Sequence, residues 1–171
     1  MTRHPAIVHW SDIENPTPWQ YDDDPEPMGH NASFGHHFRL KRLGIHHQRL
    51  LPGRRTSFPH AESVEDEFVY VIAGTPDVWL DGVLHRLAPG DGIGFPAGTG
   101  LAHSFINNTD ADVQLLVVGD RDNQANRIVY PVNPERKAKH ENWWTDAPPR
   151  TLGPHDGLSD QRRAEMTKPK T

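Results

Sequence analysis

The chain of 171 residues contains no cysteine, which excludes disulfide bonds and thiolate metal sites. It also lacks long apolar runs. Its start does not have the hydrophobic segment of a signal peptide, and no stretch approaches the length needed to cross a membrane. We therefore expect a cytoplasmic protein with no membrane partner. The formal charge of −5 and the absence of a basic cluster argue against a nucleic-acid partner.

Proline and glycine, by contrast, are abundant, with 16 and 14 copies. Such a composition disfavours long helices and favours short strands joined by turns. Apolar residues concentrate between about Phe38 and Val118, and the flanking sequence is polar and rich in turn residues. We therefore predict an N-terminal arm over residues 1–33, a β domain over residues 34–132, and a C-terminal arm and tail over residues 133–171. Trp10 and Trp19 are the expected anchors of the first arm.

Short alternating segments predict an all-β barrel or sandwich. The segment 34–51 suggests two strands broken near Gly44, and Asp81-Gly82 is a strong hairpin signal. Residues 159–165 could form one or two turns of helix. The remaining predicted strands cover residues 67–73, 77–80, 83–87, 102–107, 113–118 and 127–132.

Four potential metal ligands lie in two of these strand-and-turn segments. His60 and Glu62 are two residues apart, so in an extended chain their side chains project to the same side. Glu67 leads a strand face that is otherwise apolar, and a carboxylate there is costly to bury without a partner. His103 follows a turn rich in proline and glycine. A bound metal ion would be a suitable partner for Glu67.

The two segments resemble the paired motifs of the cupin superfamily, in particular those of small single-domain bacterial cupins. The resemblance implies a cupin double-stranded β-helix, or jelly-roll barrel, with long irregular arms. It also implies one divalent metal ion (Zn, Mn or Fe), bound by His60, Glu62, Glu67 and His103, and a homodimer. The first motif is matched by Gly53, His60, Glu62, Glu67 and Gly74, and the second by Gly90, Pro96, Gly98, His103 and Asn107.

Glu62 departs from the cupin pattern, which usually has histidine at that position. Glu62 can still be a ligand, which would make the site more anionic. Alternatively, His60, Glu67 and His103 form a two-histidine, one-carboxylate face, and Glu62 is the catalytic acid or base beside it. A third alternative is that the substitution has weakened the site and that no metal is bound.

The favoured function is a metalloenzyme acting on a small polar molecule by isomerase, lyase or dioxygenase chemistry. The alternative is a barrel that binds or senses a small, sugar-like ligand without transforming it. The fold alone does not distinguish an enzyme from a binding module. His46 and His47 are adjacent and face opposite sides of a strand. We assign His47 and Arg49 to substrate binding, although a one-residue shift in register would reverse the faces.

Overall fold

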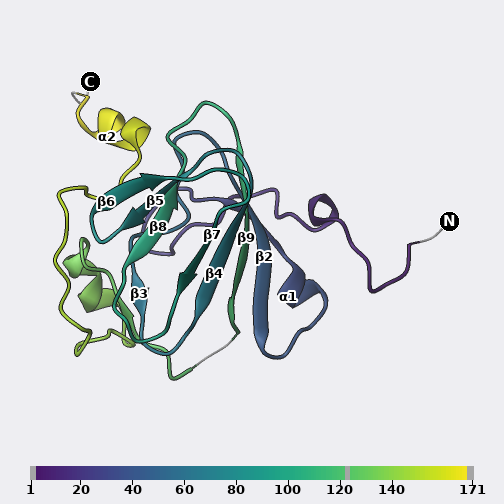
Figure 1. The fold of residues 1–171 in the computed structure, drawn as a ribbon, viewed down its shortest axis with the longest axis horizontal. Coiled ribbons are helices and arrows are strands. Elements are labelled where there is room, and N and C mark those ends of the chain that lie inside the picture. The colour runs from purple at the N-terminus through teal and green to yellow at the C-terminus, as the bar shows by residue number, and fades with distance from the viewer. Residues whose placement is uncertain (1–2, 122–123, 169–171) are drawn as a thin grey trace.

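The computed structural model describes residues 3–121 and 124–168. Two antiparallel sheets face each other in a jelly-roll arrangement, and a short two-stranded sheet lies at one end (Figure 1). The larger sheet has the order β1-β2-β9-β4-β7, the smaller one β6-β5-β8, and the short one β10-β3. The strands are β1 (His30–Ser33), β2 (Leu43–Leu50), β3 (Ala61–Glu62), β4 (Glu67–Ala73), β5 (Asp77–Leu80), β6 (Val83–Arg86), β7 (Gly92–Phe95), β8 (His103–Ile106), β9 (Val113–Asp120) and β10 (Ile128–Val129).

Strand periodicity separates the inside of the barrel from the outside. On β4, Val69 and Val71 are fully buried, whereas Phe68, Tyr70 and Ile72 are exposed. The main core cluster contains buried side chains from β2, β4, β5, β7, β8 and β9. The all-β prediction is therefore confirmed. The predicted Asp-Gly hairpin is also confirmed, because Asp81 and Gly82 both have positive φ, at 44° and 87°, as a type I′ turn requires.

The segment 34–51 differs from the prediction of two strands broken near Gly44. Phe34–His37 is a short helix, α1, and the Ser33 side chain caps it by accepting a hydrogen bond from the His36 backbone N–H. β2 then runs without interruption through Gly44, which pairs with Gly119 of β9. The prediction failed because a capped turn of helix has too few residues to show a helical period, while the strand is fixed by pairing with a distant segment.

The helices are short and lie outside the barrel. They are the 3-10 helices η1 (Trp10–Asp12) and η2 (Pro134–Lys139) and the C-terminal helix α2 (Asp160–Met166), which confirms the helix predicted near residues 159–165. In the part of the chain that the structure describes, no helix is long and apolar enough to cross a membrane. The two ends of the chain leave the body at separate places (Figure 1).

Two buried arginines hold the arms in place, Arg55 by joining both arms to the barrel and Arg136 by joining the C-terminal arm to the N-terminal arm. The Arg55 guanidinium donates to both Glu26 carboxylate oxygens, at 2.8 and 2.7 Å, and to the Gly157 carbonyl at 2.9 Å. Arg136 donates to Asp23 at 3.0 Å, and its guanidinium lies 4.3 Å from the centre of the Tyr21 ring. Each contact joins residues that are far apart in sequence. The irregular arms are therefore held in fixed positions around the barrel.

Candidate functional site

A cavity of about 350 Å³ lies inside the barrel and is partly covered by the N-terminal arm. This volume falls at the small end of the range for ligand-binding pockets. Its lining comes from the arm, from strands of both sheets and from the segment around β10. The lining residues are Trp19, Tyr21, Asn31, His46, Gln48, Thr56, Ser57, His60, Glu67, Val69, His103, Phe105, Val117, Ile128 and Tyr130.

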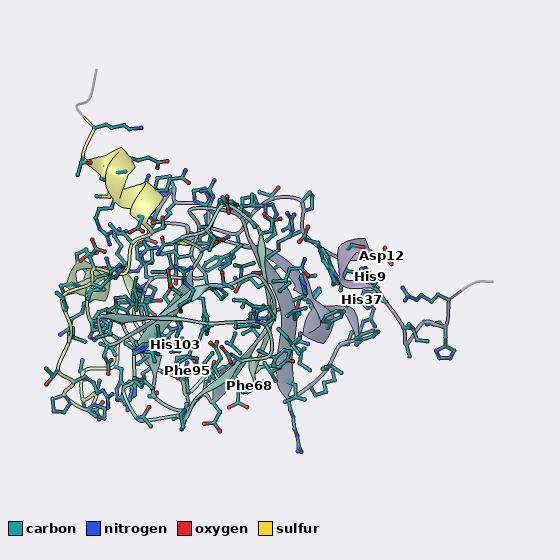
Figure 2. All side chains as sticks on the ribbon, turned by 45° about the horizontal axis from the view of Figure 1, so that its top comes forward. His9, Asp12, His37, Phe68, Phe95 and His103 are labelled. Atoms are coloured by element: carbon teal, nitrogen blue, oxygen red, sulfur yellow. The ribbon has the colours of Figure 1, made fainter. Side chains whose placement is uncertain are left out.

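Three of the four predicted metal ligands line this cavity. His103 Nε2 and Glu67 Oε1 are 3.0 Å apart, and the rings of His60 and His103 are 5.0 Å apart. The His60 Nδ1 atom lies 2.9 Å from the Phe58 carbonyl oxygen, which leaves Nε2 as the nitrogen available to a ligand. His103 also stacks on Phe95 at 3.5 Å, and the two side chains lie together in Figure 2. The spacing of the two motifs thus brings His60, Glu67 and His103 together.

His46 is a further member of this group. On β2, His46 and Gln48 line the cavity, whereas His47 and Arg49 lie on the opposite face of the strand. We call His46, His60, Glu67 and His103 the histidine–carboxylate cluster. The sequence signal for His46 was its place beside His47, and the pairing of β2 with β9 selects which of the two faces inward.

His47 and Arg49, the predicted substrate-binding residues, are not brought to the cavity. His47 stacks on Trp10 of the N-terminal arm, with ring centres 4.2 Å apart. Arg49 donates to the Glu14 carboxylate at 2.8 and 3.0 Å. The two side chains lie on the face of β2 that turns away from the cavity, and a shift of one residue in register turns every side chain of a strand to its other face. Both residues instead hold the arm, and the Trp10 contact confirms the anchor predicted there.

Glu62 lies next to the histidine–carboxylate cluster but does not line the cavity. Its carboxyl group hydrogen-bonds with the Asn126 side chain. Burial, together with the nearby carboxylates of Glu65 and Glu67, raises the pKa of Glu62 from 4.5 to about 8. Glu62 is therefore largely protonated at neutral pH. A carboxyl group with such a pKa is suited to exchanging protons near pH 7.

The protonation states of the cluster favour metal ligation. Burial and the neighbouring His103 lower the pKa of His60 to about 4, and burial also lowers the pKa of His46. Both rings are therefore neutral at pH 7, as a metal-binding imidazole must be. Burial alone would raise the pKa of Glu67, but that pKa is lowered, chiefly by the hydrogen bond with His103. Glu67 is thus ionised.

Among the residues that the structure describes, no group of three or more His, Asp or Glu side chains has the arrangement of a formed metal site. Glu67 and His103 hydrogen-bond to each other instead. To bind an ion, this pair has to exchange its hydrogen bond for two metal–ligand bonds. The donor types nevertheless fit, because imidazole nitrogens with a carboxylate oxygen suit Zn, Fe and related divalent ions.

A wall of aromatic side chains lies beside the cluster. We use "aromatic wall" for Trp19, Tyr21 and Tyr130. The ring centres of Trp19 and Tyr21 are 4.7 Å apart, those of Tyr21 and Tyr130 are 6.4 Å apart, and Tyr130 lies 6.0 Å from His60. The phenol groups of Tyr21 and Tyr130 also share a hydrogen bond. The rings therefore form a continuous surface that leads to the histidines.

Residues 46–119, which are under half of the chain, match the family model of the Cupin domain. A solved structure that is similar to this jelly-roll barrel is described as a member of the cupin superfamily. The aromatic wall lies outside the matched residues, since Trp19 and Tyr21 precede them and Tyr130 follows them. The family match therefore covers the histidine–carboxylate cluster but not the wall.

The chain is similar to three known proteins over part of its length. It is 35% identical to a sugar phosphate isomerase of the cupin superfamily from Silicibacter pomeroyi, with a TM-score of 0.57 over 60% of this chain and 64% of that one. It is 33% identical to a candidate sugar phosphate isomerase from Acidithiobacillus ferrooxidans, also with a TM-score of 0.57, over 60% of this chain and 65% of that one. The protein SchB from Streptomyces halstedii is 40% identical over 65 residues, which are 38% of this chain and 45% of SchB. The chain thus spans under half of SchB and just under two thirds of the two solved structures.

Proposed function

We propose that the protein is a metal-dependent cupin enzyme that acts on a small molecule bound in the barrel cavity. The observation that carries this proposal is that His46, His60, Glu67 and His103 line one cavity. Three imidazoles and one carboxylate are supplied by four different strands or loops. A cluster of this kind inside an otherwise largely apolar cavity has no evident structural purpose. A divalent ion is the partner that suits all four side chains.

In this proposal His60, Glu67 and His103 hold the ion, and His46 is the fourth candidate ligand. His46 then occupies the place in the ligand set that the usual cupin histidine, replaced here by Glu62, would fill. The contact between His60 Nδ1 and the Phe58 carbonyl fixes the ring orientation. When bound, the ion would supply Lewis acidity toward a carbonyl or hydroxyl oxygen of the substrate.

Glu62 is the proposed proton donor and acceptor. Its raised pKa, about 8, keeps a proton on the carboxyl group at neutral pH, and the hydrogen bond with Asn126 orients that group. Isomerases and lyases both need a group that gives and takes a proton near pH 7. The candidate reactions are isomerase, lyase and dioxygenase chemistry, and two of the similar solved structures are described as sugar phosphate isomerases.

Elemental analysis of purified protein tests the proposal. We expect near-stoichiometric Zn, Mn or Fe in the wild type, loss of the metal in His103→Ala, and weaker retention in His46→Ala. His47→Ala is the matched control, because His47 is adjacent in sequence but on the opposite face of β2. Glu62→Gln should keep its metal and lose activity.

A wild type that contains no metal and takes up none of these ions would overturn the enzyme proposal. The protein would then be a barrel that binds a small ligand without transforming it. Loss of the metal in Glu62→Gln would make Glu62 a ligand rather than an acid or base. Equal metal loss in His46→Ala and His47→Ala would show a general effect on folding.

A further inference from the structure

The composition of the cavity lining bears on the class of molecule that it accepts. Among the described residues that line it, none is lysine or arginine. Glu67 contributes a negative charge, and Glu62 lies close enough to Glu67 for the two carboxyl groups to interact. Phosphate groups are normally bound by arginine, lysine or converging backbone N–H groups. The site therefore lacks the side chains that recognise a phosphate.

The buried cation that packs on the aromatic wall, Arg136, does not line the cavity. The Arg136 guanidinium is 3% exposed and lies 4.3 Å from the ring centres of both Tyr21 and Phe58, and 5.1 Å from that of Tyr130. It is also paired with Asp23. Arg136 thus supports the aromatic wall and is already neutralised, so it is not a phosphate ligand.

Beside its polar residues, the lining offers a continuous area of ring surface and apolar side chains. The aromatic wall is continuous with the histidine–carboxylate cluster, and Val69, Phe105, Val117 and Ile128 extend the apolar surface. Two of the polar groups are already engaged. Thr56 Oγ1 accepts from the Phe105 backbone N–H at 3.0 Å, and Ser57 Oγ lies 3.3 Å from His60 Nδ1.

One polar atom of the lining lacks a partner. The Oδ1 atom of Asn31, on β1, is buried and has no hydrogen-bond partner. Buried polar atoms are rarely left unpaired in folded proteins. A ligand hydroxyl group is a donor of the type that would satisfy it.

We propose that the cavity binds a hydroxylated aromatic molecule, with its rings against Trp19, Tyr21 and Tyr130 and a hydroxyl group at Asn31, and not a sugar phosphate. Offset or edge-to-face contacts between rings stabilise such a complex beyond the area that they bury. This inference rests on the proposed function only in taking the same cavity as the site. It names the class of substrate for that cavity.

Calorimetric titration with 2-naphthol, fructose and fructose 6-phosphate tests the inference, with and without Zn. We expect 2-naphthol to bind and the two sugars not to displace it. Trp19→Ala should weaken 2-naphthol binding about tenfold, and Trp19→Phe, which keeps a ring, should weaken it less. Trp10→Ala is the matched control, because Trp10 lies on the same arm but stacks on His47 outside the cavity.

Asn31 is tested by comparing 2-naphthol with naphthalene, which lacks the hydroxyl group. Asn31→Ala should weaken 2-naphthol binding about fivefold and leave naphthalene binding unchanged. Tighter binding of fructose or fructose 6-phosphate than of 2-naphthol would overturn the inference, as would equal effects of Trp10→Ala and Trp19→Ala. Binding of 2-naphthol to a protein that takes up no metal would remove the proposed enzyme function and leave this inference standing.

Discussion

The histidine–carboxylate cluster and the aromatic wall share one cavity but are assembled in different ways. The cluster is carried by the barrel, on residues that match the cupin family model, and strand pairing fixes its side chains. The wall is carried by segments outside that match, and the buried Arg136 and Arg55 hold these segments through ion pairs with residues that are distant in sequence. In the proposed function, the barrel would therefore supply the groups for chemistry, and the flanking segments would supply the surface that selects a ligand. Two proteins that share this barrel can thus differ in what they bind through their arms alone.

The largest expected effect comes from detaching the arms. In Glu26→Gln, the Arg55 guanidinium, which is 1% exposed, loses the carboxylate that it pairs with. Leaving a buried charge without its partner should lower the free energy of unfolding by about 3 kcal/mol. Urea denaturation measures this change. Metal uptake by the folded variant should persist, because the cluster is built on the barrel.

The control for that experiment is Asp146→Asn. It breaks the ion pair between Arg127 and Asp146, whose side chains are 45% and 69% exposed. An exposed pair of this kind contributes less than about 1 kcal/mol. If Glu26→Gln destabilises the protein no more than this control does, Arg55 is not the link between the arms and the barrel.

A smaller effect is expected at Glu62 and depends on pH. The pKa of Glu62 is raised in the folded protein, from 4.5 to about 8, so folding favours its protonated form. The stability that this provides is complete below about pH 4.5 and is lost as the pH rises through 8. In metal-free protein, Glu62→Gln should remove this loss. The free energy of unfolding of the variant minus that of the wild type should be about 2 kcal/mol larger at pH 9 than at pH 5, after allowance for solvent screening. If the difference in the free energy of unfolding between Glu62→Gln and the wild type is the same at both pH values, the raised pKa of Glu62 is contradicted.

The smallest effect is expected outside the cavity. His47→Ala removes the stacking contact with Trp10 and should cost about 1 kcal/mol of stability. Ligand affinity and metal content should not change, because His47 faces away from the cavity. Thermal unfolding together with the 2-naphthol titration measures both quantities. A loss of affinity as large as that of Trp19→Ala would mean that the N-terminal arm acts as one unit.

The sequence predicts the cluster better than the wall, for physical reasons. His60, Glu67 and His103 lie at motif spacings on short strands, where a period of two residues determines which side chains share a face. The resemblance of the two segments to the cupin motifs predicted that these residues share a site, and they line one cavity. Their role as metal ligands remains a prediction. His46 was missed, and His47 and Arg49 were assigned in its place, because local sequence does not specify the register between β2 and β9. Trp19 was expected only as a packing anchor, and its place in the cavity depends on contacts with distant residues.

The ion pair between Asp23 and Arg136 bears on the order in which parts of the chain fold. The two residues are 113 positions apart in sequence, Asp23 in an irregular segment and Arg136 in the short helix η2. The entropic cost of closing such a loop is repaid only after the strands between them have formed. During synthesis, a chain that already has its barrel histidines still lacks one side of its cavity until residue 136 has left the ribosome. Ligand binding would therefore be one of the last properties that the nascent protein acquires.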